Sequence, residues 1–239
     1  MNNAVILCAG AGTKLWPYAQ IRSKAMLPVS NKPVVSYAVD ALTDLGFTNI
    51  VLVGSRFAEE IKAYFRDYKN VTVITDPAPK GSAFSLLCAR DAIKAGSFLA
   101  LYGDTIVSKA DLAKLVEAFD AGNQPQALVT PVKDRSSDYI GCKLEGRRIS
   151  EVWGHSRDES THFFAGFAFD STFFDILPYN PARFAYTEVG MMPPVEAFLE
   201  ISVADEIRRG NPVGAVLAEN PVYDIDKPWH ILEANAGIN

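Results

Sequence analysis

The sequence predicts an α/β fold in which helices cover both faces of a mixed, mainly parallel sheet. Short apolar segments, several of them ending at glycine, alternate with segments of helical periodicity from Ala4 to Ala121. These apolar segments carry no polar face, which is typical of parallel strands that are buried on both sides. The pattern changes after Gln124, where strand-like segments follow one another directly.

The elements expected before Gln124 succeed one another in strand–helix order. Gly46 and Gly96 follow two of the helical segments, where glycine commonly ends a helix. The segments expected to form strands are 4–8, 49–53, 71–74 and 98–102, and those expected to form helices are 34–45, 58–68, 82–95 and 109–121. Ligands in parallel sheets bind beyond the carboxyl ends of the strands, so the residues that follow the first and fourth strands are candidates for a site.

The elements expected after Gln124 are mostly strands joined by turns. The expected strands are 127–132, 140–144, 149–152, 164–169 and 213–217, and the expected helices are 196–209 and 228–236. A stretch rich in proline and aromatic residues lies between Phe173 and Pro194. No change of composition marks a linker, so we expect one Rossmann-like domain over 1–239, with halves at 1–124 and 125–239.

The composition is that of an ordinary folded protein. Of the 239 residues, 49% are hydrophobic and 21% are charged, the formal net charge is −5, and no apolar run approaches the length of a membrane helix. We therefore expect neither a membrane partner nor a nucleic-acid partner. Cys8, Cys88 and Cys142 show no zinc spacing, and a reducing, cytoplasmic location is expected. The composition leaves open whether the chain forms a homo-oligomer.

The loop after the first expected strand has the properties of a phosphate-binding site. Its glycines let the backbone approach a phosphate closely, and successive backbone N–H groups can form a nest for an anion. Lys14 adds positive charge there, and Lys24 can add more. The dinucleotide fingerprint fails because Leu15 stands where it needs glycine, and the Walker pattern fails because Thr13 precedes the lysine. A tight turn without a ligand is the alternative interpretation.

Three motifs near the N-terminus resemble those of one enzyme family. They are residues 10–17 (GAGTKLWP), 23–29 (SKAMLPV) and 32–33 (KP). In order and spacing they resemble the signature G-x-G-T-R-L-x-P, [PS]-K-x-[ML]-[LV]-P-V and K-P of the sugar-phosphate nucleotidylyltransferases, which include glucose-1-phosphate thymidylyltransferases and uridylyltransferases. The resemblance implies the nucleotide-diphospho-sugar transferase fold and a reaction that joins a nucleoside triphosphate to a sugar 1-phosphate with release of pyrophosphate.

Further segments extend the resemblance over nearly the whole chain. Residues 80–83 (KGSA) resemble the segment that holds the base, and residues 102–104 (YGD) resemble a Gly-Asp pair whose aspartate binds magnesium. Residues 165–167 (AGF) resemble a segment near the sugar, and residues 199–202 (LEIS) resemble a segment whose glutamate holds sugar hydroxyls. Residues 223–228 (YDIDKP) resemble W-x-D-x-G-[TR]-P, whose first aspartate is the second metal ligand.

The resemblance implies a role for each of these residues. It makes 1–124 the nucleotide-binding half and 125–239 the acceptor-binding half. The implied nucleotide-binding residues are Leu7, Ala9, Gly10, Ala11, Gly12, Thr13, Lys14, Gly81, Ser82 and Asp104. The implied acceptor-binding residues are Lys24, Gly166, Glu200 and His155. Asp104 and Asp224 would bind Mg²⁺, and Lys14, Lys24 and Asp104 would be catalytic.

The implied chemistry needs no general base, because the attacking phosphate is already an anion. Catalysis would rest on alignment and on neutralisation of charge. Lys14 would stabilise the developing pyrophosphate, and Lys24 would contact the α-phosphate and the acceptor phosphate.

Three positions depart from the family pattern. Lys14 stands where the family has arginine, which keeps the charge but loses the bidentate fork. Asp226 and Lys227 stand where the family has glycine and Thr or Arg. The family's E-K-P segment, whose lysine contacts the acceptor phosphate, is replaced by residues 152–155 (VWGH), in which His155 lies closest to the vacant position.

Two other functions stay open at this level. Aromatic residues in the second half either line a pocket for a cationic head group or belong to the core: Trp153, Phe163, Phe164, Phe167 and Phe169. A pocket would suit a cytidylyltransferase for phosphocholine or a related phospho-alcohol. The missing E-K-P lysine would also suit a non-catalytic, nucleotide-binding regulatory subunit. We expect His162 and His230 to be structural.

Overall fold

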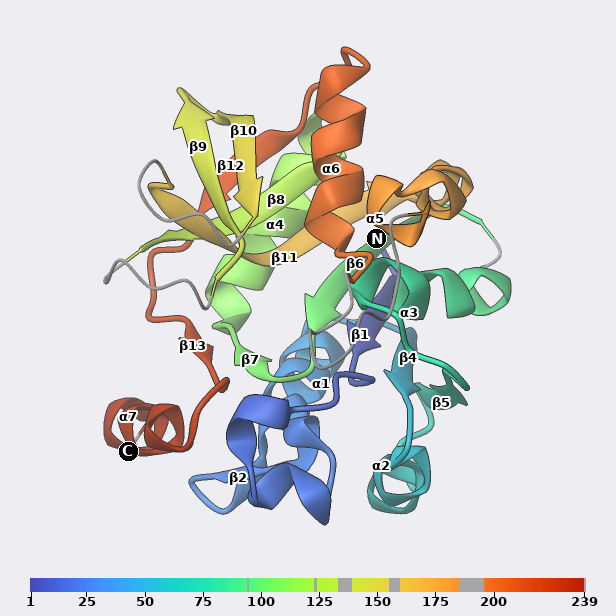
Figure 1. The fold of residues 1–239 in the computed structure, drawn as a ribbon, viewed down its shortest axis with the longest axis vertical. Coiled ribbons are helices and arrows are strands. Elements are labelled where there is room, and N and C mark those ends of the chain that lie inside the picture. Colours follow the sequence, from blue (N-terminus) through green and yellow to red (C-terminus); the bar gives the residue numbers. More distant parts are fainter. Residues whose placement is uncertain (94, 123, 133–138, 155–159, 185–195, 239) are drawn as a thin grey trace.

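A single mixed sheet of nine strands runs through the protein, in the order β5-β4-β1-β6-β11-β8-β12-β10-β9. The computed structural model describes residues 1–93, 95–122, 124–132, 139–154, 160–184 and 196–238. Figure 1 shows β5 and β9 at opposite ends of the molecule. The predicted α/β fold with a mixed sheet is confirmed, although its second half is mostly antiparallel.

The strands of the first half are parallel and lie where the apolar segments predicted them. They are β1 (Asn3–Leu7), β4 (Asn49–Gly54), β5 (Val71–Thr75) and β6 (Ser97–Tyr102). β1 lies between β4 and β6, and its residues from Ala4 to Leu7 are buried. Because the three strands are parallel, the loops that follow them emerge at the same edge of the sheet.

One long strand, β11 (His162–Asp170), joins the two halves of the sheet. It pairs antiparallel with β6 on one side and with β8 (Gln126–Pro131) on the other. The sheet continues with β12 (Gly214–Leu217), β10 (Arg148–Gly154) and β9 (Gly141–Glu145). The first residues of β11 extend past the end of β6, so they lie at the edge where the loop after β6 begins.

Helices cover both faces of the sheet, as predicted. One face packs against α1 (Val34–Asp44), α2 (Ala58–Phe65) and α4 (Lys109–Gly122), and the other packs against α3 (Ser82–Cys88), α5 (Pro181–Phe184) and α6 (Leu199–Arg208). Successive side chains of β1 point to opposite faces of the sheet. Ala4 and Ile6 pack in the core beneath α1, α2 and α4, and Val5 and Leu7 pack in the core beneath α3, α5 and α6.

Two expected helices are shorter than their periodicity predicted. α2 ends at Phe65, where the Tyr68 N–H turns back to bond the Phe65 carbonyl at 3.0 Å. α3 ends at Cys88 and is followed by a 3₁₀ turn, η4 (Arg90–Ala92). The Asn49 side chain donates to the Ala92 carbonyl at 3.1 Å, which satisfies a carbonyl that a continuing helix would use.

Short elements that have no strong periodicity complete the fold. They are η1 (Thr13–Leu15), η2 (Tyr18–Gln20), η3 (Lys24–Met26), β2 (Pro28–Val29), β3 (Lys32–Pro33), β7 (Thr105–Ile106), η5 (Ser171–Asp175), η6 (Leu177–Tyr179), β13 (Tyr223–Asp224) and α7 (Pro228–Ile238). β13 pairs with β7 and brings the C-terminal segment to the end of β6. In the described part of the chain, no helix has the length and apolar character needed to cross a membrane.

Candidate active site

The loops after β1 and β6 meet at one edge of the sheet. The Gly103 N–H donates to the Leu7 carbonyl at 2.9 Å, and a Cβ at Gly103 would lie 2.5 Å from the Cys8 sulfur. Glycine is therefore required there for the two loops to touch. Burial, reinforced by the charge of Asp104, raises the pKa of the Cys8 thiol, which makes Cys8 a packing residue rather than a nucleophile.

The predicted phosphate loop follows β1 and leaves room above its backbone. The Ser55 hydroxyl donates to the Ala9 carbonyl at 2.9 Å and ties the start of the loop to the end of β4. Among the described residues, no atom lies within 4 Å of a Cβ placed on Gly10, so packing does not explain this glycine. Gly12 has a φ of +65° and a Cβ there would meet Ala19 at 2.9 Å, which does require glycine.

Lys24 lies at the centre of a charged cluster. Its ammonium is 2.7 Å from Oδ2 of Asp104 and 3.1 Å from Oδ1 of Asp226, and only 12% of its side chain is exposed. Burial acts to lower the pKa of Lys24, but the carboxylates of Asp104, Asp224 and Asp226 outweigh burial and raise it. Lys24 is therefore fully protonated at neutral pH.

Lys14 joins the same cluster from the loop after β1. Its ammonium lies 2.9 Å from Oδ2 of Asp226, and its side chain is about half exposed. The structure thus brings together the two lysines that the sequence singled out. The residue that joins them, Asp226, entered the sequence analysis only as a departure from the family pattern.

Pairing of β7 with β13 brings together the two aspartates predicted to bind metal. Thr105 lies opposite Asp224, and the Ile225 N–H donates to the Asp104 carbonyl at 2.9 Å. Burial, together with the negative charge of Asp104, raises the pKa of Asp224 to about 7. Lys24 lowers that pKa but does not bring it back to its ordinary value.

These two carboxylates fit a magnesium ion. Within the described ranges, no three His, Cys, Asp or Glu side chains form a metal-binding group by themselves. Magnesium commonly takes only one or two protein carboxylates and completes its shell with phosphate oxygens and water. Burial is the main cause of the raised pKa of Asp224 and the charge of Asp104 adds to it, so a bound cation would favour the ionised form of this carboxylate.

The predicted base-binding segment has a structural role in this structure. Gly81 has a φ of +118°, and a Cβ there would lie 2.6 Å from the backbone of Ala197. The Ser82 hydroxyl accepts from the Leu199 N–H at 2.8 Å at the start of α6. The loop from Asp76 to Gly81 follows β5 and so belongs to the same edge of the sheet as the loop after β1.

The predicted acceptor residues Glu200 and Gly166 lie beside β6. Glu200 is buried and accepts from the Tyr102 hydroxyl at 2.5 Å, and Tyr102 is the last residue of β6. Burial raises the pKa of Glu200, and its Oε2 has no hydrogen-bond partner in the described part of the protein. Gly166 pairs with Leu101, and a Cβ there would lie 2.6 Å from the Leu101 side chain.

Other residues singled out in the sequence have separate outcomes. His155 lies outside the described residues. The four phenylalanines proposed as either pocket or core are buried, and all but Phe163 belong to the main core cluster: Phe163, Phe164, Phe167 and Phe169. The His230 ring accepts from the Asp226 N–H at 3.2 Å, a structural role as expected. Trp153 Nε1 is buried without a partner among the described residues, a feature that periodicity could not reveal.

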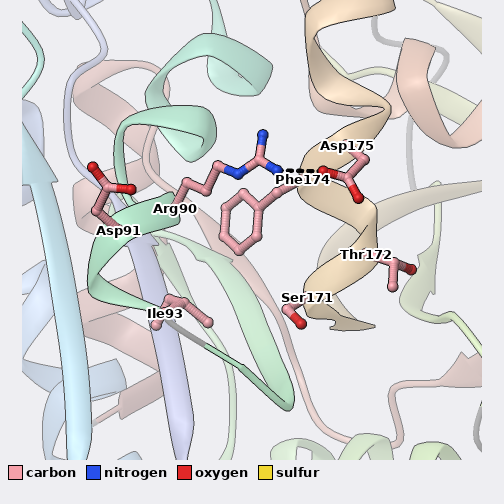
Figure 2. Close-up of a pocket in the computed structure, with 7 residues that line it drawn as sticks. All are labelled: Arg90, Asp91, Ile93, Ser171, Thr172, Phe174 and Asp175. Atoms are coloured by element: carbon pink, nitrogen blue, oxygen red, sulfur yellow. Dashed lines mark hydrogen bonds and ion pairs between the residues drawn. The ribbon is translucent and has the colours of Figure 1, made fainter.

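One cavity, of about 540 Å³, lies away from this cluster. Figure 2 shows Arg90 and Asp175, from η4 and η5, joined by an ion pair across it. Ser171 begins η5 immediately after Asp170, which pairs with the first residue of β6. The cavity therefore lies at the opposite edge of the sheet from Asp104, and it contains none of the predicted site residues.

Comparison with known proteins agrees with this geometry. The chain is 36% identical over 239 residues to the low-salt glycan biosynthesis nucleotidyltransferase Agl11 of Haloferax volcanii, an alignment that covers 97% of this chain and 64% of that protein. It spans 54% of the bifunctional protein GlmU of Methanococcus vannielii, to which it is 25% identical over 98% of its own length. The chain thus spans about half to two thirds of these curated relatives.

A solved structure shares the fold at low sequence identity. UDP-glucose pyrophosphorylase complexed with UDP-glucose superimposes with a TM-score of 0.84 at 17% identity, covering 100% of this chain and 98% of that one. At this identity the likeness concerns the fold alone. Residues 4–216 match the MobA-like NTP transferase domain, and on this match, which covers most of the chain, the protein belongs to the MobA-like NTP transferase family.

Proposed function

We propose that the protein transfers a nucleoside monophosphate from a nucleoside triphosphate to a sugar 1-phosphate and releases pyrophosphate, with Mg²⁺ as its metal. The observation that carries this proposal is the convergence of Lys14, Lys24, Asp104 and Asp224 at the carboxyl edge of β1 and β6. Ammonium groups beside a pair of partly buried carboxylates are suited to bind a metal-complexed polyphosphate.

The chain's own groups supply binding and charge neutralisation. The acceptor phosphate oxygen attacks the α-phosphorus, and the bond from that phosphorus to the oxygen of the leaving pyrophosphate breaks. Lys24 is the more buried lysine and lies against Asp104, so it is suited to the α-phosphate and the attacking phosphate. The more exposed Lys14 is suited to the leaving pyrophosphate. Asp104 and Asp224 would hold Mg²⁺, which neutralises charge on the phosphates when bound.

The environment of Glu200 supports a polyhydroxylated acceptor. Its Oε2 is buried and has no partner among the described residues, so a hydroxyl donor of a sugar would satisfy it. Three of the phenylalanines that could have formed a pocket for phosphocholine pack in the core instead, and the fourth, Phe163, is buried. The charged cluster favours an enzyme over a regulatory subunit, because a subunit that only bound nucleotide would not need two carboxylates beside Lys24.

The proposal is tested by a matrix of donors and acceptors. Four nucleoside triphosphates are paired with a panel of hexose 1-phosphates, inositol 1-phosphate and phosphocholine, and pyrophosphate release is measured with Mg²⁺. We expect release with at least one triphosphate and one hexose 1-phosphate, and none without an acceptor. Pyrophosphate release with phosphocholine alone would show that the acceptor is a phospho-alcohol and not a sugar 1-phosphate. No pyrophosphate release with any pair would contradict the enzymatic proposal.

The metal is tested separately from the acceptor. With the best pair of substrates, activity should disappear on addition of a chelator and return when Mg²⁺ is restored. Activity that persists in excess chelator would show that Asp104 and Asp224 serve another purpose.

A further inference from the structure

Asp226 bonds both lysines proposed to bind the donor's phosphates. Its Oδ2 lies 2.9 Å from the Lys14 ammonium and its Oδ1 lies 3.1 Å from the Lys24 ammonium. Each carboxylate oxygen of Asp226 thus accepts a hydrogen bond from one of the two lysines. The family signature carries glycine at this position, so the carboxylate is a feature of this chain that the proposed reaction does not account for.

The backbone holds Asp226 firmly in this place. Its N–H donates to the His230 ring at 3.2 Å, in the first turn of α7. The preceding residue, Ile225, is fully buried and bonds the Asp104 carbonyl through its N–H at 2.9 Å. The Asp226 side chain is itself only 16% exposed. Asp226 thus occupies one N–H donor of each ammonium, and a ligand that binds both lysines through those donors displaces the carboxylate by side-chain rotation.

The carboxylate and a phosphate compete for the same N–H donors. Both are anions that bind an ammonium group through oxygen, and charge-assisted bonds of this kind are the strong ones. Three carboxylates already surround the two lysines, from Asp104, Asp224 and Asp226. A single phosphate replaces one carboxylate with one anion and gains little. A polyphosphate can contact both lysines at once with separate phosphates, and so it competes with more charge.

We propose that Asp226 is an internal counter-ion that occupies Lys14 and Lys24 in the free protein and is displaced by the polyphosphate of the donor. This inference rests on the proposed function and adds a residue that sets specificity. Asp226 weakens binding of every anion to the two lysines, and it weakens binding of a single phosphate most. The site therefore selects a triphosphate over inorganic phosphate, which any cell contains.

The test uses inorganic tripolyphosphate, a probe that carries the phosphates without a base or a reaction. Its affinity is measured by calorimetry without divalent metal for the wild type, Asp226→Asn and Asp226→Gly. Both variants should bind about tenfold tighter or more, the usual effect of freeing a charged hydrogen-bonding partner. Inorganic phosphate should bind measurably to both variants and much more weakly to the wild type.

A matched control separates the local effect from net charge. Asp67→Asn removes the same charge from a side chain that is 86% exposed and pairs with its neighbour Arg66. It should bind tripolyphosphate as the wild type does. Equal tightening in Asp67→Asn would assign the effect to overall charge and overturn the inference.

The remaining outcomes also decide the question. Unchanged or weaker tripolyphosphate binding in both Asp226 variants would overturn the inference, since Asp226 would then hold the lysines in place for the ligand. Failure of both variants to fold would overturn it too, because a displaceable counter-ion cannot be essential to the fold. The two proposals can also fail separately. If the protein releases no pyrophosphate but both Asp226 variants bind tripolyphosphate more tightly, the proposed reaction is wrong and the counter-ion role of Asp226 stands.

Discussion

Lys24→Ala is the substitution that should damage catalysis most selectively. The ammonium group bonds two carboxylates at 2.7 and 3.1 Å and is mostly buried, so water would replace it poorly. Its removal leaves Lys14 and the proposed Mg²⁺ to neutralise the charge that develops on the phosphates. Removing one stabilising contact to transition-state charge typically lowers the rate by about 10²–10³, which corresponds to about 3–4 kcal/mol of activation free energy.

The assay is steady-state release of pyrophosphate at saturating Mg²⁺ with the best substrate pair. We expect kcat to fall by about 10²–10³ in Lys24→Ala, with part of the loss recovered in Lys24→Arg because arginine keeps the charge. Lys62→Ala serves as the control, since Lys62 is partly exposed on α2 and pairs with Glu59. Thermal unfolding confirms that each variant is folded. A folded Lys24→Ala protein with wild-type kcat would refute the role given to this lysine.

Three further predictions concern the carboxylates. Asp104→Ala and Asp224→Ala should each abolish pyrophosphate release while the protein stays folded, and full activity of either variant at ordinary Mg²⁺ would exclude it as a ligand. Glu200→Gln should raise the acceptor KM by about tenfold and leave the nucleotide KM nearly unchanged, because only the acceptor would bond Oε2. An equal rise in both constants would show that Glu200 does not act in acceptor binding. Asp111→Ala should destabilise the fold by about 3 kcal/mol in urea unfolding, because this buried carboxylate accepts four hydrogen bonds. These bonds outweigh burial and lower the pKa of Asp111, so the difference from wild type should be complete at neutral pH and shrink as the pH falls below about 4; a difference that grows in acid would contradict this assignment.

The sheet and its main helices could be predicted because each carries a periodic signal of sufficient length. Strands such as β1 are apolar on both faces, and α1 and α4 present one apolar face over three turns or more. α3 shows where such reasoning ends. Its apolar pattern continues to Ile93, but a 3₁₀ turn replaces the last helical turn, and the Asn49 side chain donates a tertiary hydrogen bond to the Ala92 carbonyl.

The partners within the candidate site were less accessible to sequence reasoning. β7 and β13 have two residues each, too few for any periodicity, yet their pairing is what places Asp104 beside Asp224. Motif resemblance named these two aspartates, but nothing in the sequence showed that they would meet through β13. Asp226 stood out only as a departure, because its bonds to Lys14 and Lys24 span about two hundred residues of chain.

The burial of individual atoms could not be predicted either, because it too depends on contacts between residues far apart in the chain. Trp153 was grouped with four phenylalanines. Only the structure separates its buried indole nitrogen, which has no partner in the described part of the chain, from the burial of those four rings. The role expected for Mg²⁺ and the role expected for each site residue in binding stay predictions.

The central claim is that the acceptor phosphate attacks the α-phosphorus of a nucleoside triphosphate. It is tested most directly with an acceptor whose non-bridging phosphate oxygens are labelled with ¹⁸O, by measuring the mass of each product by mass spectrometry. If the account is correct, all the label appears in the nucleotide-linked product and none in the pyrophosphate. Label in the pyrophosphate, or a nucleoside monophosphate as the main product, would contradict it.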